Sequence, residues 1–222
     1  METAGLRERK KQATRELIAE NARRLFAERG FEGVTVAEVA RAADVSQQTV
    51  FNYFPRKEDL VYWRLESFEE DLLSTIRERP AGESVLAAFG RFLLVQRGLL
   101  ASGDPDATER LVAITRMIAA SPALRARERE VFADYTASLA ALIAAEPGSG
   151  AESEAWVAAN AMIGAHRALV DHARRRIVEG ADPKTVAREV GARGRAALAL
   201  LERGLGGYAV RPGPGRVPRR AG

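Results

Sequence analysis

The sequence predicts an all-α protein with nine helices in two domains. Apolar residues recur at helical spacing almost from end to end, and β-branched runs with strand-like alternation are absent. A hydrophobic content of 46% in 222 residues is enough for buried cores and excludes a wholly disordered chain. Glycine and proline breaks delimit the helices. We expect a helix-turn-helix domain over residues 1–56, a larger helical domain over 57–204 and a disordered basic tail over 205–222.

The amino-terminal domain is predicted to contain three helices. The first starts near Lys11 and ends at Gly30, a residue suited to the left-handed position that closes a helix. The second begins at Thr35, which has the spacing of a capping box with Glu38. The third begins at Ser46, a good N-cap. Two short helices joined by a tight turn match a helix-turn-helix, whose second helix lies in the DNA major groove.

Longer helices are predicted beyond Pro55. A fourth continues to Pro80, and a fifth covers residues 85–100. Turn signals then separate helices over about 105–120, 122–145 and 152–179. The ninth opens at Asp182 and Pro183, with the aspartate as N-cap, and ends near residue 204. No fixed-period repeat is present, which argues against a solenoid.

The third helix is predicted to have two chemically different faces. At 100° per residue, Val50 and Phe54 share a side that can be buried. The residues expected on the outward side are Gln47, Gln48, Phe51 and Asn52. Asparagine and glutamine amides can pair with adenine, and an aromatic ring can contact the thymine methyl group. This face therefore fits a DNA groove better than bulk water.

The stretch from Thr35 to Leu60 closely resembles the DNA-binding domain of the TetR family of bacterial transcriptional regulators, and the resemblance covers about residues 10–62. Three positions depart from the family pattern: Asp44 stands where glycine is usual, Gln48 where glycine or proline is frequent, and Phe51 where tyrosine is usual. The resemblance implies contacts to the DNA backbone from four residues, namely Thr35, Thr49, Tyr53 and Lys57. The full set of predicted DNA contacts is Thr35, Ser46, Gln47, Gln48, Thr49, Phe51, Asn52, Tyr53 and Lys57.

The charge distribution adds little to the DNA argument. The net charge is +4, but the tail carries four arginines and no acid, so the rest of the chain is neutral overall. The tail is either a solubilising extension or an electrostatic DNA arm. The five basic residues between Arg7 and Arg15 are either a minor-groove arm, as in the family, or a frayed charged terminus.

The helices beyond residue 56 resemble the family's regulatory domain in length and number only. The amino-terminal sequence looks most like actinobacterial members whose regulatory domain binds acyl-CoA-like ligands, so the resemblance implies a small-molecule effector, acyl-CoA-like or hydrophobic. Aromatic residues at helical spacing are more often core than pocket, and two arginines could pair with a carboxylate or phosphate. The candidate pocket residues are Trp63, Phe68, Phe89, Phe92, Leu93, Arg97, Arg116, Met117 and Phe132.

The last two predicted helices are expected to form a dimer interface. Their small and apolar residues allow close approach of helices, and in TetR-like proteins this pair forms a four-helix interface with its copy. The candidate interface residues are Met162, His166, Leu169, Ala173, Val190, Ala197 and Leu201. His166 and His172 are accordingly expected to pack or to line the rim, and not to bind a metal.

Several function classes are excluded. The chain has no cysteine and two histidines, so it lacks a thiolate metal site and a cysteine nucleophile. It also lacks a P-loop and a histidine near a plausible nucleophile, which argues against an enzyme. No apolar run reaches the ~18 residues of a membrane span, and no signal sequence is evident. We expect a cytoplasmic protein without cofactor, metal or membrane partner.

These observations together predict a ligand-responsive homodimeric transcriptional repressor. Its helix-turn-helix would bind a palindromic DNA operator, and a small molecule in the helical domain would release it. The alternative is a helical protein-interaction module that reuses the fold without binding DNA. The exposed polar and aromatic residues of the third helix count against that alternative.

Overall fold

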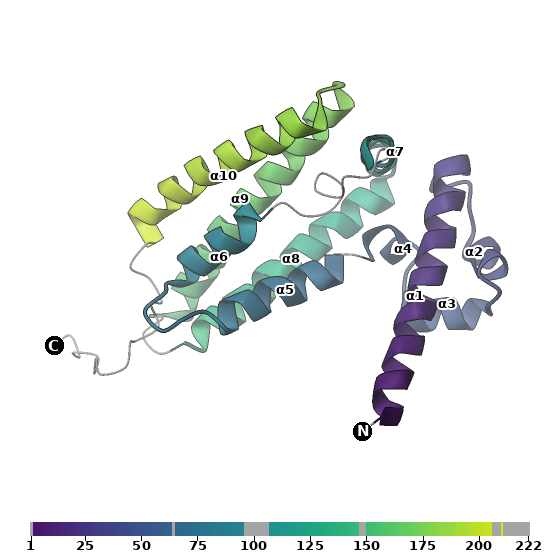
Figure 1. The fold of residues 1–222 in the computed structure, drawn as a ribbon, viewed down its shortest axis with the longest axis horizontal. Helices are drawn as coiled ribbons and strands as arrows, with labels where there is room; N and C mark the ends of the chain where they lie inside the picture. Colours follow the sequence, from purple (N-terminus) through teal and green to yellow (C-terminus); the bar gives the residue numbers. More distant parts are fainter. Residues whose placement is uncertain (1, 64, 96–106, 147–149, 206–209, 211–222) are drawn as a thin grey trace. The chain divides into compact units, whose positions relative to one another are not determined.

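The computed structural model describes residues 2–63, 65–95, 107–146, 150–205 and 210, and this part of the chain is all-α. The chain divides into two compact units (Figure 1). The first unit comprises Met1–Glu66 and Ala113–Glu128, and the second comprises Ser67–Val112 and Arg129–Gly222. The first unit therefore combines the amino-terminal helices with a segment from the middle of the chain.

The first unit contains α1 (Glu2–Arg29), α2 (Val36–Ala42), α3 (Gln47–Tyr53) and α4 (Asp59–Tyr62). Helix α1 starts earlier than the predicted position near Lys11, and it ends as predicted, with Gly30 at φ +74°. Side chains from all four helices share one core, in which the largest buried residues include Ile18, Phe26, Val39, Val50, Phe54 and Leu60. This core fixes α2 and α3 against α1.

Local hydrogen bonds start α2 and α3 at the predicted residues. The Thr35 backbone N–H donates to Glu38 Oε2 at 2.8 Å, and the Glu38 N–H donates to Thr35 Oγ1 at 3.3 Å, which completes the capping box. Ser46 Oγ accepts from the Thr49 N–H at 3.0 Å. Between the two helices, Asp44 adopts φ +52°, a left-handed conformation that favours glycine. The turn of the helix-turn-helix is therefore tight and locally strained.

The predicted fourth helix is two helices, so the described residues form ten helices where nine were expected. Helix α4 ends at Tyr62, and α5 (Leu65–Arg77) begins the second unit. The Tyr62 hydroxyl donates to the Leu124 carbonyl at 3.0 Å, and Arg127 Nε donates to Asp59 Oδ1 at 2.7 Å. These bonds hold α4 in the first unit, against the segment that joins α7 (Ala107–Ala120) to α8 (Pro122–Ala144).

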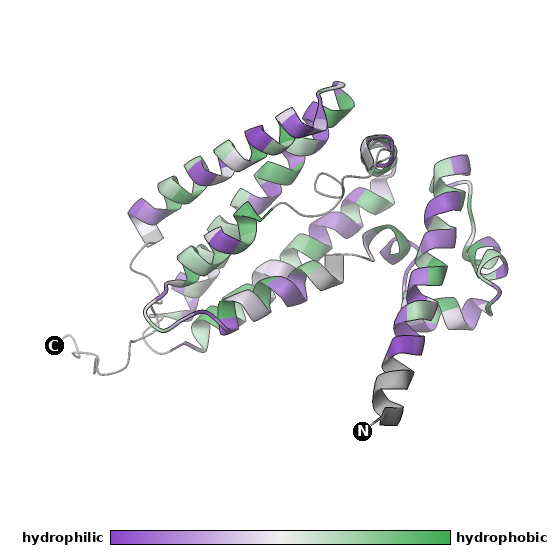
Figure 2. Cartoon of the chain, in the orientation of Figure 1, coloured by the Kyte–Doolittle hydropathy of each residue, from purple (hydrophilic) through white to green (hydrophobic). Residues whose placement is uncertain are grey.

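The second unit is built from α5, α6 (Val85–Leu94), most of α8, α9 (Glu152–Val178) and α10 (Pro183–Leu205). Helix α6 is buried on most sides and packs against α9 and α10, which run side by side (Figure 1). In Figure 2, α6 carries mostly hydrophobic residues, whereas hydrophobic and hydrophilic residues alternate along α10. Buried Arg79 donates to Glu146 at 2.9 Å and so ties the end of α5 to the end of α8.

The turn before α10 forms as the sequence predicts. Asp182 Oδ2 accepts the Thr185 N–H at 2.9 Å, Pro183 is the first helical residue, and Gly180 adopts φ +84°. Of the predicted tail beyond α10, only Val210 is described, and it forms an isolated antiparallel bridge with Ser84. The remainder of that prediction lies outside the described residues.

Candidate nucleic-acid interface

Helix α3 presents the two faces that its periodicity predicts. Val50 and Phe54 are buried, each with 1% of its surface exposed, and they anchor the helix in the core of the first unit. Gln47, Gln48 and Asn52 are exposed, and so is 42% of Phe51. Gln48 Nε2 donates to Asn52 Oδ1 at 3.1 Å. A ring this exposed gains nothing from water, so the outward face is suited to a partner surface.

Three of the hydroxyl residues of the predicted set, Thr35, Ser46 and Thr49, lie at the starts of α2 and α3, whereas Tyr53 is the last residue of α3. Thr35 Oγ1 donates to Glu38 Oε2 at 2.8 Å, and Ser46 Oγ lies 2.8 Å from Thr49 Oγ1. Tyr53 is half-buried and packs against the core of the first unit. Thr35 and Ser46 therefore have established structural roles as caps, and their contacts to DNA remain a prediction.

Lys57 lies in the turn before α4, which begins at Asp59. Its Nζ atom is 4.1 Å from the centre of the Phe31 ring and 6.0 Å from that of Phe26. Both distances allow a cation–π interaction. The aromatic pair thus holds the ammonium group in place.

An ion pair that the sequence analysis missed joins α1 to α2. Arg29 Nη1 donates to Glu38 Oε1 at 2.7 Å, and Arg29 Nη2 donates to the Gly33 carbonyl at 2.6 Å. The Thr35 backbone N–H, with help from Arg29, lowers the pKa of Glu38 to about 2. Glu38 therefore stays ionised at neutral pH and fixes the start of α2 to the end of α1. Of these contacts, only the capping box of Thr35 and Glu38 has a local sequence signal.

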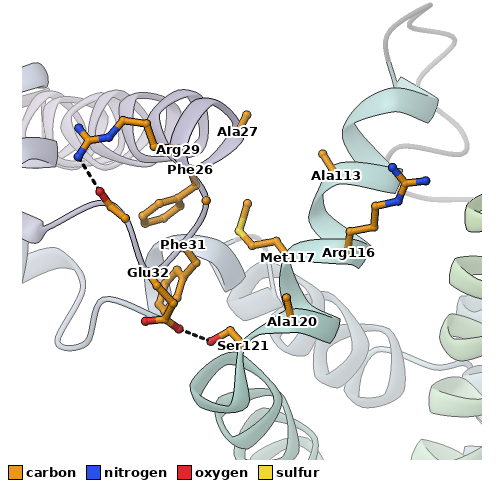
Figure 3. Close-up of a pocket in the computed structure, with 12 residues that line it drawn as sticks. Phe26, Ala27, Arg29, Phe31, Glu32, Ala113, Arg116, Met117, Ala120 and Ser121 are labelled. Carbon is orange, nitrogen blue, oxygen red and sulfur yellow. Dashed lines mark hydrogen bonds between the residues drawn. The ribbon is translucent and has the colours of Figure 1, made fainter.

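The predicted ligand-pocket residues are divided between the two units. Trp63 packs on the core of the first unit, where Arg116 and Met117 line a pocket of about 450 Å³ (Figure 3). In the second unit, Phe89 is fully buried, Leu93 is half-buried, and Phe68, Phe92 and Phe132 belong to an aromatic cluster. Arg97 lies outside the described residues. Two members of the set, Arg116 and Met117, line the pocket of the first unit.

The aromatic cluster of the second unit centres on Phe68 and joins four helices. The Phe68 ring lies 4.4 Å from the His166 ring and nearly parallel to it, with an interplanar angle of 21°. Tyr135 and Phe92 lie 5.4 and 5.1 Å from Phe68, measured between ring centres, and Phe132 lies 6.0 Å from His166. Burial, with a smaller contribution from Arg174, lowers the pKa of His166 to about 4. The imidazole is therefore neutral at pH 7.

The candidate dimer residues differ in how accessible they are. Met162, Leu169 and Ala173 are buried by helices of the same chain, whereas Val190, Ala197 and Leu201 on α10 are half-buried. His166 stacks on Phe68. The exposed apolar side chains on α9 and α10 include Trp156, Val157 and Leu200. Helical periodicity identified the apolar faces but could not say which of them the chain itself covers.

His172 connects α9 to α10. Its Nε2 atom is 2.9 Å from Glu189 Oε2, and Arg176 Nε donates to the same oxygen at 3.1 Å. Among the described residues, no group of three or more histidine, aspartate or glutamate side chains is placed to hold a metal ion. None of the described helices is long and apolar enough to cross a membrane.

Comparison with known proteins identifies the amino-terminal unit. Residues 13–62 match the model of the tetR family of bacterial regulatory proteins. Residues 13–62 therefore form a domain of the tetR family. The family description is that of regulatory proteins, which agrees with the helix-turn-helix domain predicted for this part of the chain.

Curated relatives resemble part of the chain. The transcriptional regulator TcmR of Streptomyces glaucescens is 30% identical over 146 residues, which are 65% of this chain and 65% of TcmR. The transcriptional repressor AcnR of Corynebacterium diphtheriae is 32% identical over 51% of this chain and 54% of AcnR. The matches thus span about half to two thirds of the relatives' lengths.

A solved structure has a similar fold over most of the chain. NalD of Pseudomonas aeruginosa, described as the secondary repressor of a multidrug efflux pump, superposes with a TM-score of 0.53 at 20% identity. The superposition covers 84% of this chain and 97% of NalD. At this identity the likeness concerns the fold alone.

Proposed function

We propose that this TetR-family protein is a transcriptional repressor whose α3 reads a palindromic DNA operator. The observation that carries the proposal is the outward face of α3, where Gln48, Phe51 and Asn52 are exposed above a fully buried face. Amide groups can form paired hydrogen bonds with adenine, and the Phe51 ring can contact a thymine methyl group. The anchored inner face lets this helix enter a groove as a rigid element.

The test is binding to DNA from upstream of the protein's own gene, measured by fluorescence anisotropy. Asn52→Ala should lower the affinity about tenfold, because one good base contact contributes ~1 to 3 kcal/mol of discrimination. The matched control is Asn160→Ala on α9, which removes an exposed asparagine from the other unit and should leave binding unchanged. Absence of DNA binding by the unaltered protein would instead favour the protein-interaction module.

The repressor assignment is our extension from the relatives. AcnR and NalD are described as repressors, and a dimer that covers an operator blocks access to the promoter without any activating surface. A reporter gene behind the operator tests this directly. Expression should rise when the protein is deleted, and a fall on deletion would mark an activator.

We propose that the second unit holds the effector, as the family resemblance implies, and that the effector is hydrophobic and acyl-CoA-like. The half-buried Phe68 and His166 provide an apolar surface and imidazole nitrogens for which no hydrogen bond is found in the described residues. A ligand that binds one conformation about 100-fold better would change operator affinity by ~2.7 kcal/mol at most. Native mass spectrometry with added decanoyl-CoA should show one molecule bound per chain and a matching loss of DNA binding.

A further inference from the structure

A pocket of about 450 Å³ lies within the first unit, which also contains α3. Its walls come from the end of α1, the turn at residues 30–33 and the α7 segment up to Ser121 (Figure 3). Small-molecule sites typically measure ~300 to 1,000 Å³. We propose that this pocket binds an uncharged aromatic small molecule, as a ligand site separate from the effector site proposed for the second unit.

The walls of the pocket favour a flat, apolar occupant. The Phe26 and Phe31 rings lie 5.3 Å apart and are tilted by 56°, and the Met117 side chain points toward them from α7 (Figure 3). Thioether sulfur and aromatic rings both make favourable contacts with a further ring. The remaining apolar wall consists of small side chains that leave the space open, namely Ala27, Ala113 and Ala120.

Three of the polar side chains at the edge of the pocket, Glu32, Ser121 and Arg29, already form hydrogen bonds. Glu32 Oε1 accepts a hydrogen bond from Ser121 Oγ at 2.7 Å, and Arg29 donates to the Gly33 carbonyl and to Glu38. The guanidinium of Arg116 points away from Phe26 and Phe31 (Figure 3). A charged ligand would lose hydration against the apolar wall formed by Phe26, Phe31 and Met117. This wall therefore favours an uncharged ligand.

A ligand in this pocket would contact the two rings that hold Lys57, one of the predicted DNA-contact residues. Phe31 and Phe26 line the pocket and also carry the ammonium group of Lys57, at 4.1 and 6.0 Å. A ring bound against this aromatic pair thus acts inside the DNA-binding unit itself. It does not need the second unit to transmit a signal.

The test uses methionine labelled with carbon-13 at its methyl group and the neutral probe 2-naphthol. The chain has three methionines, of which Met117 lines the pocket and Met162 is buried in the second unit. The ring current of bound 2-naphthol should shift the Met117 methyl resonance in a saturable manner and leave that of Met162 in place. A Met162 shift without a Met117 shift, or no shift of either at millimolar probe, would overturn the proposal.

Two adjacent alanines provide matched variants. Ala120→Leu places a larger side chain in the pocket and should weaken 2-naphthol binding about tenfold, because the added side chain occupies space that the probe needs. Ala119→Leu makes the same change at an exposed α7 residue that does not line the pocket and should bind as the unaltered protein does. Equal affinities for both variants, or equally tight binding of 2-naphthalenesulfonate, would contradict the assignment. No DNA is needed, so the result is independent of the proposed function.

Discussion

At the scale of single residues, Asp44 shows how one departure from the family pattern affects stability. It stands in the helix-turn-helix where the family usually has glycine, and its φ of +52° is in the left-handed region. This conformation costs a side-chain-bearing residue ~1 to 2 kcal/mol, and glycine loses ~0.5 to 1 kcal/mol of additional entropy on folding. Asp44→Gly should therefore stabilise the protein by about 0.5 to 1 kcal/mol in urea denaturation. Destabilisation would show that the carboxylate makes a compensating contact.

The half-buried imidazole of His166 predicts how stability depends on pH. Its pKa falls from 6.5 to about 4 on folding, mainly through burial against Phe68. The folded protein keeps the ring neutral, whereas the unfolded chain protonates it below pH 6.5. Protonation of His166 in the unfolded chain therefore leaves the free energy of unfolding unchanged above pH 6.5. It lowers that free energy progressively as the pH falls toward 4, by about 3 kcal/mol at most.

Denaturation curves of His166→Phe, compared with the unaltered protein at pH 7 and at pH 4.5, isolate this effect. Phenylalanine keeps a ring against Phe68 and removes the titrating group, so the variant should lose less stability between the two pH values. The ion pair between Glu38 and Arg29 should not break at pH 4.5, because the pKa of Glu38 is lowered to about 2. Its loss therefore does not account for a difference between the two pH values. Parallel losses in both proteins would contradict the assignment to His166.

At the scale of elements, the short loop before α4 is predicted to hold the DNA backbone through Lys57. A backbone contact carries no base information, so Lys57→Ala should weaken binding to all operator variants about equally and reduce the salt slope by roughly one phosphate. The matched control is Lys184→Ala, which removes an exposed lysine from α10. Losses that depend on the operator sequence would instead give Lys57 a role in base recognition.

Sequence predicted those features that depend on neighbours along the chain. The Thr35 capping box, the Ser46 cap and the end of α1 at Gly30 all formed as expected, because their partners lie within four residues. The Tyr62 hydroxyl, by contrast, bonds to Leu124, 62 residues away. That bond lies at the last residue of α4, and no local pattern predicts it. Helical periodicity continues across the break, so the two helices read as one.

The same distinction between local and long-range contacts applies to the candidate sites. The faces of α3 follow from 100° per residue and one buried side, so its exposed residues were predictable. The stacking of His166 on Phe68 depends on which side of α9 the chain itself covers. The pocket in the first unit needs α7 to reach the end of α1, which only the tertiary fold provides. Sequence therefore supports the DNA-binding face more strongly than either ligand site.

At the scale of the whole molecule, a palindromic operator requires two reading helices and hence two chains. We propose that the apolar residues of α9 and α10 that the chain leaves exposed form the interface between the two chains, since Val157 and Leu200 are 65% and 63% exposed. Met162 and Leu169 are buried internally, so charges there would disturb folding as well as association. Substitutions at the exposed positions separate the two effects.

Val157→Asp and Leu200→Asp should each lower the mass measured by light scattering at micromolar concentration from that of a dimer toward that of a single chain. A buried, unpaired carboxylate at an apolar interface costs several kcal/mol, whereas in the separated chain it is hydrated. Leu17→Asp is the matched control, because Leu17 on α1 is also exposed, by 49%, but lies in the other unit. Loss of the dimer should also lower operator affinity steeply. In the dimer, binding of one half-site holds the second chain close to the other half-site, and separate chains lose this effect. If both α9 and α10 variants stay dimeric while remaining folded by circular dichroism, the interface lies elsewhere on the chain.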